Sequence, residues 1–173
     1  QAPKYGNDNP EADEMALRVH QHICEYTRDR AQHCGLDSYL VVVINNSANT
    51  SMGKYTLASA DGRRAYQPLA NANNPSGGSD VNGLTAMLNS LVKLPTDIHA
   101  GSVQNLKLSR EMFSRFYEKT KGILDVYFAR GGSQLMINVL GRGDLENALK
   151  EPEKYRNLIV RVGGFCARFV ELE

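Results

Sequence analysis

The fold of this chain is decided by a run close to its last residues, Ile159-Val160-Arg161-Val162-Gly163-Gly164-Phe165-Cys166-Ala167-Arg168-Phe169. Leucine, isoleucine and valine dominate residues 158–162, and a short apolar, β-branched run of this kind predicts a buried strand. Two consecutive glycines then interrupt the pattern, which is typical of a turn or of a close approach between backbones. The residues before the run therefore have to supply the scaffold that holds it in place.

Length and composition are those of one globular region. The chain has 173 residues, of which 42% are hydrophobic, and this is enough to bury a core. Its formal net charge is +1, with both signs mixed along the sequence, so no basic surface for nucleic acid is indicated. No apolar run approaches the roughly 18 residues of a membrane span, and the first residues lack the pattern of a signal peptide. We therefore expect a cytoplasmic protein with neither nucleic acid nor membrane as a partner.

The cysteines and histidines do not predict a metal site. Cys24, Cys34 and Cys166 are an odd number without paired short spacing, so neither a disulfide framework nor a zinc site is indicated. Free thiols fit best, with Cys24 as a buried side chain, Cys34 at a helix end and Cys166 packed beside the glycines. His20 and His22 are two residues apart on a predicted helix and point to different faces, so we expect no shared metal.

Strands alternate with helices along the chain, which indicates an α/β layout. Asn9 is a suitable cap for a first helix that ends near Gly35, and the apolar residues from Met15 to Tyr26 recur at near-helical spacing and make one apolar face. The run Tyr39–Ile44 predicts a strand buried on both faces. Gly122 is expected to mark a kink in a long helix or a close contact with another helix. The remaining predicted elements are helices over 84–94, 109–131 and 144–150, and strands over 135–139 and 158–162.

Residues 45–83 differ in composition from the segments on either side. They are crowded with Asn, Gly, Ser and Pro and show little apolar periodicity, which predicts turns and loops. A structureless loop of this length is uncommon inside a compact domain. Either the loop has a function of its own, or it packs against more protein than these residues.

The string Arg161-Val162-Gly163-Gly164-Phe165 resembles the Arg-Val-x-Gly-Tyr/Phe signature of the glycyl radical enzymes. In that family the second glycine carries the radical. The resemblance therefore implies that Gly164 is the radical residue and that Arg161 positions the loop or supports activation. The chemistry agrees with this choice, because an α-carbon radical is nearly planar and glycine has no Cβ to crowd it.

Further blocks resemble the same family in the same order. Gly53-Lys54-Tyr55-Thr56 and residues 60–65, 67–70 and 82–90 are similar to family blocks, although Ala60 and Gln67 depart from the usual Pro and Glu. The likeness begins near residues 4–8. In the family such segments line the barrel mouth and approach the substrate, which implies a functional role for the long loop.

The resemblance implies an α/β fold that is the C-terminal part of the glycyl radical enzyme barrel, including its glycine-radical loop. Residues 1–108 would form a late barrel segment with long loops, and residues 109–173 the glycine radical domain. In the family the radical passes to a cysteine in a Gly-Cys-x-x-Pro type loop, and Cys24, Cys34 and Cys166 all lack that context. We therefore assign no thiyl residue and expect this chain alone to be incomplete and inactive.

The implied function is the radical-storing part of an anaerobic, oxygen-sensitive lyase, with dehydratase or decarboxylase chemistry favoured over that of pyruvate formate-lyase. No bound cofactor is implied, since the radical is installed by a separate iron–sulfur activating enzyme that uses S-adenosylmethionine. The other implied partners are the remainder of the barrel, a small-molecule substrate and a second copy of the full enzyme in a homodimer. The alternative is a stand-alone radical carrier, a spare part that docks onto a glycyl radical enzyme damaged by oxygen.

Overall fold

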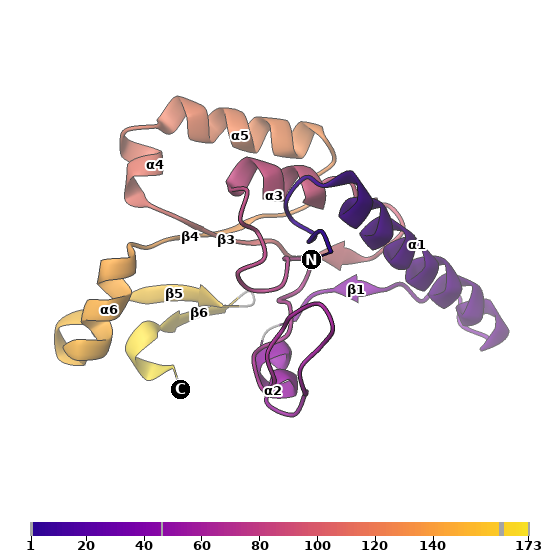
Figure 1. Cartoon of the computed structure of the whole chain (residues 1–173), viewed down its shortest axis with the longest axis horizontal. Helices are drawn as coiled ribbons and strands as arrows, with labels where there is room; N and C mark the ends of the chain where they lie inside the picture. Colours follow the sequence, from indigo (N-terminus) through magenta and orange to yellow (C-terminus); the bar gives the residue numbers. More distant parts are fainter. Residues whose placement is uncertain (1, 46, 163–164, 173) are drawn as a thin grey trace.

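The computed structural model describes residues 2–45, 47–162 and 165–172, which form helices joined by short strands. Figure 1 shows helix α1 (Pro10–His33) along one side, helices α3 (Leu84–Leu91) and α5 (Tyr117–Ala129) together above the central strands, and a hairpin at the end opposite α1. The mixture of helices and strands confirms the predicted α/β class.

Helix α1 begins where the sequence predicts. The side chain of Asn9 accepts hydrogen bonds from the backbone N–H groups of Glu11 and Ala12, at 3.1 and 3.2 Å. Pro10 occupies the first helical turn, where its missing N–H costs no hydrogen bond. Local chemistry therefore sets the start of the helix.

Charged side chains fasten the start of α1 to the end of α3. Lys93 Nζ lies 2.6 Å from carboxylate oxygens of both Asp8 and Asp13, and Asp13 is buried. The backbone N–H of Asp8 also donates to the Ser90 hydroxyl, at 2.9 Å. Because a buried carboxylate is costly without a partner, Lys93 is the group that allows Asp13 to remain inside.

Two parallel strand pairs form the centre of the molecule. Strand β1 (Val42–Val43) pairs with β2 (Gly101–Ser102), and β3 (Asn105–Leu108) pairs with β4 (Met136–Val139) in register from Asn105↔Met136 to Leu108↔Val139. β2 and β3 follow each other in the chain, so residues 101–108 link both pairs. Strand β4 confirms the strand predicted over 135–139, whereas β2 and β3 were not predicted.

The core lies where α3 and α5 pack over β3. Tyr127 is only 3% exposed, and its hydroxyl donates to the carbonyl of Gln134 at 3.2 Å. Burial raises the pKa of Tyr127 to about 12, so the ring stays neutral. The buried members of this cluster are Met87, Leu88, Leu91, Leu106 and Tyr127.

Two apolar surfaces that the sequence assigns to the interior are exposed. Strand β1 is shorter than the predicted run over 39–44, and Val42 is 53% exposed. The prediction of a strand buried on both faces was wrong for the described chain, because Val42 and Ile44 are exposed. On α1, Met15 is 56% exposed. The exposed apolar residues of these two surfaces are Met15, Val19, Ile23, Tyr26, Tyr39, Leu40, Val42 and Ile44.

The helix predicted over 109–131 is two helices, α4 (Arg110–Ser114) and α5. The chain leaves helical geometry at Phe116, where φ is −117° and ψ is 29°. The hydroxyl of Thr120 donates to the carbonyl of Met112 at 2.6 Å and so satisfies a group that the break releases. The break therefore lies at Phe116 and not at Gly122, which lies within α5, so the kink that was one of the two alternatives for Gly122 is not at that residue.

The long loop over 45–83 contains one helix in its described part, α2 (Ala48–Gly53), which the sequence did not predict. Side-chain amides hold the rest. Asn74 Nδ2 donates to the carbonyl of Asn105 at 2.9 Å, and the backbone N–H of Asn105 donates to Asn74 Oδ1 at 2.8 Å. Asn7 Nδ2 donates to the carbonyl of Ser79 at 2.6 Å. Asn74, inside the segment, thus fixes it to β3, and Asn7 fixes it to the N-terminal residues.

Candidate functional site

The two strands on either side of the consecutive glycines form an antiparallel hairpin. Strand β5 (Ile159–Val162) pairs with β6 (Phe165–Arg168), from Ile159↔Arg168 to Val162↔Phe165. Gly164, the predicted radical residue, lies outside the described residues, as does Gly163. The structure therefore places the two strands that flank Gly164, and the radical assignment stays a prediction.

Short helices fasten the base of the hairpin. Helix α6 (Arg142–Lys150) starts slightly earlier than predicted, and the 3-10 helices η1 (Pro152–Tyr155) and η2 (Phe169–Glu171) precede and follow the two strands. The backbone N–H of Leu158 donates to the carbonyl of Tyr155, and that of Phe169 to the carbonyl of Leu158, both at 2.8 Å. The hairpin therefore leaves the scaffold at a defined point.

Arg161, the second predicted site residue, lies on β5 with its side chain exposed. One guanidinium nitrogen donates to Cys166 Sγ at 3.3 Å, directly across the hairpin. Cys166 is exposed as well, and the glycines beside which it is predicted to pack lie outside the described residues. The structure thus brings Arg161 and Cys166 together on the two strands that lead into and out of the glycines.

A third residue, Asn138 on β4, joins this site and was not predicted. Its Nδ2 donates to the carbonyl of Arg161 at 2.9 Å, and its Oδ1 accepts from the backbone N–H of Arg161 at 2.7 Å. The only sequence signal was an asparagine inside an otherwise apolar strand, where strand propensity disfavours it.

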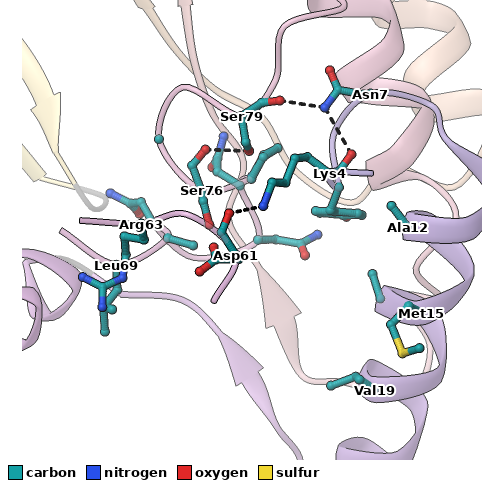
Figure 2. A pocket seen from close by; sticks show the side chains of 18 of the residues that line it. Lys4, Asn7, Ala12, Met15, Val19, Asp61, Arg63, Leu69, Ser76 and Ser79 are labelled. Carbon is teal, nitrogen blue, oxygen red and sulfur yellow. Dashed lines mark hydrogen bonds between the residues drawn. The ribbon is translucent and has the colours of Figure 1, made fainter. Parts of the chain in front are cut away.

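A large open cavity lies between α1, the N-terminal segment and the loop over 60–82. Its volume is about 2210 Å³. Figure 2 shows Ala12, Met15 and Val19 of α1 along one wall, facing loop residues that include Asp61 and Ser76. Lys4 Nζ donates to the carbonyl of Asp61 across this space. One wall of the cavity is therefore apolar and helical, and the other is made of polar loops.

The other two cysteines are distant from the hairpin in sequence and in setting. Cys24 is buried, burial raises the pKa of its thiol, and its Sγ lies 3.8 Å from His20 Nε2. Cys34 is exposed at the C-terminal end of α1. Within the described ranges, no cluster of three or more His, Cys, Asp and Glu side chains is arranged to hold a metal ion.

The decisive comparison is with protein-family models. A model described as "Glycine radical" matches residues 69–170, which include the whole hairpin and Asn138. The chain belongs to the glycine radical family. The elements from α3 to β6, including the hairpin, therefore lie within the part of the chain that the family model matches.

Known members of the glycine radical family match nearly the whole chain. The chain is 36% identical to a probable dehydratase, YbiW, of Escherichia coli over 99% of its length, and 34% identical to the glycyl radical subunit of 4-hydroxyphenylacetate decarboxylase of Clostridium scatologenes over 99%. The glycerol-bound B12-independent glycerol dehydratase of Clostridium butyricum has the same fold, with a TM-score of 0.89 and 34% identity over the full chain. These likenesses confirm the predicted family and fold.

The matches cover only part of those proteins. The chain spans 22% of the length of the E. coli protein, 19% of the decarboxylase subunit and 22% of the glycerol dehydratase. About four-fifths of a typical relative therefore has no counterpart here.

Among the described residues, no helix is both long and apolar enough to cross a membrane.

Proposed function

We propose that this chain is the radical-bearing part of an anaerobic glycyl radical lyase, in which Gly164 stores the radical. The observation that carries the proposal is the family match over 69–170, which contains the signature from Arg161 to Phe165 on the β5–β6 hairpin. Glycine suits the role because a Cβ would crowd a planar α-carbon radical.

The chemistry requires groups beyond this chain. An iron–sulfur activating enzyme that uses S-adenosylmethionine removes one hydrogen atom from the Cα of Gly164. The glycyl radical then takes a hydrogen atom from a cysteine thiol, and the thiyl radical so formed takes one from the substrate. Cys24 is buried on α1, Cys34 is at the far end of the same helix, and Cys166 is on the hairpin itself. The thiyl cysteine therefore belongs to the remainder of the enzyme.

Exposed apolar surfaces support the presence of that remainder. The α1 face, strand β1 and the outer side of β5 are uncovered, and Ile159 is 61% exposed. Patches of this kind mark surfaces that associate with other protein. An α-carbon radical also needs protection from oxygen, yet both Arg161 and Cys166 beside it are exposed here. Further barrel strands and loops would cover these surfaces and complete the cavity beside α1.

Dehydration of a small hydroxylated molecule is the favoured reaction. Two of the relatives described above are dehydratases, one of them named for glycerol, and the third is a decarboxylase. The loop wall of the cavity suits hydroxyl groups, because polar residues such as Asn71, Asn73 and Ser76 line it and side chains of these types form hydrogen bonds. We propose a dehydratase first and a decarboxylase second.

The test compares three samples that are activated without oxygen: the intact enzyme that contains this region, the 173 residues alone, and these residues mixed with an enzyme truncated before its glycine loop. Glycerol and 4-hydroxyphenylacetate are the first substrates. The proposal predicts turnover by the intact enzyme only, since proximity of radical, thiol and substrate supplies much of the catalysis. Turnover by the chain alone would contradict it, and turnover by the mixture would favour the stand-alone carrier.

A further inference from the structure

One side chain on β4 binds both backbone groups of a hairpin residue. Asn138 Nδ2 donates to the carbonyl of Arg161, and the N–H of Arg161 donates to Asn138 Oδ1, at 2.9 and 2.7 Å. A side-chain amide carries the same donor and acceptor pair as a peptide group. Asn138 thus takes the place of a neighbouring strand at this point of β5.

The strand register explains why Arg161 has both groups free. In an antiparallel pair, residues alternate between those that exchange two hydrogen bonds with the residue opposite and those that turn both groups outward. Arg161 lies opposite Cys166 and directs its N–H and carbonyl to Asn138, so it is an outward-turned residue. Outward-turned pairs also have the closer side chains, which agrees with the 3.3 Å contact between Arg161 and Cys166.

The other end of this link is rigid. Asn138 is an internal residue of β4, which pairs with β3 along its whole length, and the N–H of Met136 donates to the carbonyl of Gln104 at 2.7 Å. Neighbouring Ile137 packs against the core cluster. The two hydrogen bonds therefore connect the buried centre of the molecule to the strand that leads into Gly164.

We infer that Asn138 is a positioning residue, which fixes the radical hairpin relative to the central strands and thereby sets the distance between Gly164 and the thiyl cysteine of the full enzyme. The inference rests on the proposed function of Gly164. Storage of the radical depends on Gly164 itself, whereas transfer of the radical depends on the position of the hairpin relative to the thiyl cysteine. Loss of the Asn138 link therefore reduces transfer and spares storage.

Two substitutions of Asn138 remove either both hydrogen bonds or one of them, and a substitution of Asn74 is the matched control. Asn138→Leu keeps a similar volume and removes both hydrogen bonds, whereas Asn138→Asp keeps the acceptor for the Arg161 N–H and loses the donor. Asn74 makes the same two-bond contact with the backbone of Asn105, on β3. Asn74→Leu therefore removes an equivalent link at a different strand.

The experiment uses the intact enzyme and three readouts: hydrogen exchange of peptides over 155–170 and 101–108, the yield of the glycyl doublet by electron paramagnetic resonance, and turnover per radical. Asn138→Leu should raise exchange in 155–170 by about tenfold, as expected for the loss of two hydrogen bonds. Its radical yield should stay normal, and turnover per radical should fall on the order of 10²-fold. Asn138→Asp should lie between it and the wild type, and Asn74→Leu should raise exchange over 101–108 only.

Exchange of the core peptide over 84–91 shows whether each variant is folded. Unchanged exchange over 155–170 in a folded Asn138→Leu enzyme would overturn the inference, and so would a lower radical yield with normal turnover per radical. A wild-type enzyme without any glycyl doublet would instead overturn the proposed function. In that case the proposed role of Asn138 in radical transfer would be overturned as well. Hydrogen exchange over 155–170 would still show whether Asn138 fixes the hairpin.

Discussion

The guanidinium of Arg161 donates a hydrogen bond to the sulfur of Cys166 directly across the β5–β6 hairpin, at 3.3 Å. Both side chains are exposed, and both lie on the strands that flank the predicted radical glycine. Under the proposed function, the remainder of a glycyl radical enzyme would cover this pair.

Replacement of Arg161 by lysine is expected to lower the radical yield or its transfer several-fold. Lysine keeps the charge and loses the planar fork of donors that fixes the direction of a guanidinium. Arg168→Lys is the matched control, because Arg168 lies on β6 and pairs with exposed Glu171 at 3.1 Å, a contact of small energetic value. Spins per protein and turnover per spin measure the effect. Equal values for the two variants would contradict a special role for Arg161.

The three thiols should react differently with an alkylating reagent. In the 173-residue chain, Cys34 and Cys166 are exposed, whereas Cys24 is buried and burial raises its thiol pKa, which lowers the fraction of reactive thiolate. Mass spectrometry of the folded chain should find iodoacetamide on Cys34 and Cys166 only. In the intact enzyme Cys166 should become protected. If Cys166 reacts equally fast in both, the remainder of the enzyme does not cover the hairpin.

Gly132 is predicted to resist substitution for lack of space. An added Cβ there would meet ring atoms of Tyr127 at 2.2 and 2.4 Å, and Tyr127 is a buried member of the core. Gly132→Ala should cost about 1–3 kcal/mol by overpacking. Gly143→Ala is the control, since a Cβ in that exposed position of α6 meets nothing within 4 Å and should be neutral or stabilising by about 0.5–1 kcal/mol. Hydrogen exchange over 123–135 and 142–150 separates the two effects.

The contact between α1 and the segment over 95–101 should weaken in acid. His99 is buried, its Nδ1 lies 3.1 Å from His20 Nε2, and Cys24 Sγ lies 3.8 Å from the same nitrogen. Burial first, and then the neighbouring His20, lower the pKa of His99 below its usual value, although Asp97 opposes this. The unfolded state therefore binds a proton at a higher pH than the folded state. The stability that neutral His99 provides is complete above about pH 6.5 and is lost as the pH falls towards the lowered folded-state pKa.

Hydrogen exchange over 95–103, corrected for the intrinsic effect of pH, measures this dependence in the intact enzyme. Protection should stay nearly constant from about pH 7.5 to 6.5 and decrease as the pH falls further towards about 5.5. His99→Asn keeps a polar contact to His20 without a titrating ring, so its protection should change less over the same range. An equal decrease in both proteins would show that His99 is not the responsible group.

Helix caps and apolar patterns in the sequence correctly predicted the helices and strands that neighbouring residues determine. Asn9 and Pro10 set the start of α1, alternating apolar residues predicted β4, and the run up to Val162 predicted β5. Strands β2 and β3 were missed because Gly101, Ser102 and other small or polar residues interrupt them, and these residues have low strand propensity. Their pairing with β1 and β4 is a tertiary effect.

Burial was predicted less well than secondary structure, for a different reason. The apolar spacing of α1 and of residues 39–44 predicts burial, yet these side chains are exposed in a chain that spans about a fifth of its relatives, and under the proposed function further protein covers them. Asn138 could not be predicted either, since its partner Arg161 is 23 residues away and the contact is to the backbone. The side-chain pattern around Arg161 does not predict that its backbone N–H and carbonyl need a hydrogen-bond partner.

The most direct test of the central claim is the electron paramagnetic resonance spectrum of the activated intact enzyme with glycine deuterated at Cα. The unlabelled enzyme should give a doublet, because the radical on Gly164 couples to one remaining α-hydrogen, and deuteration should collapse it. Gly164→Ala should abolish the signal, whereas Gly163→Ala, at the variable position of the signature, should retain it. A doublet that survives deuteration, or one that persists in Gly164→Ala, would place the radical on another residue and contradict the account.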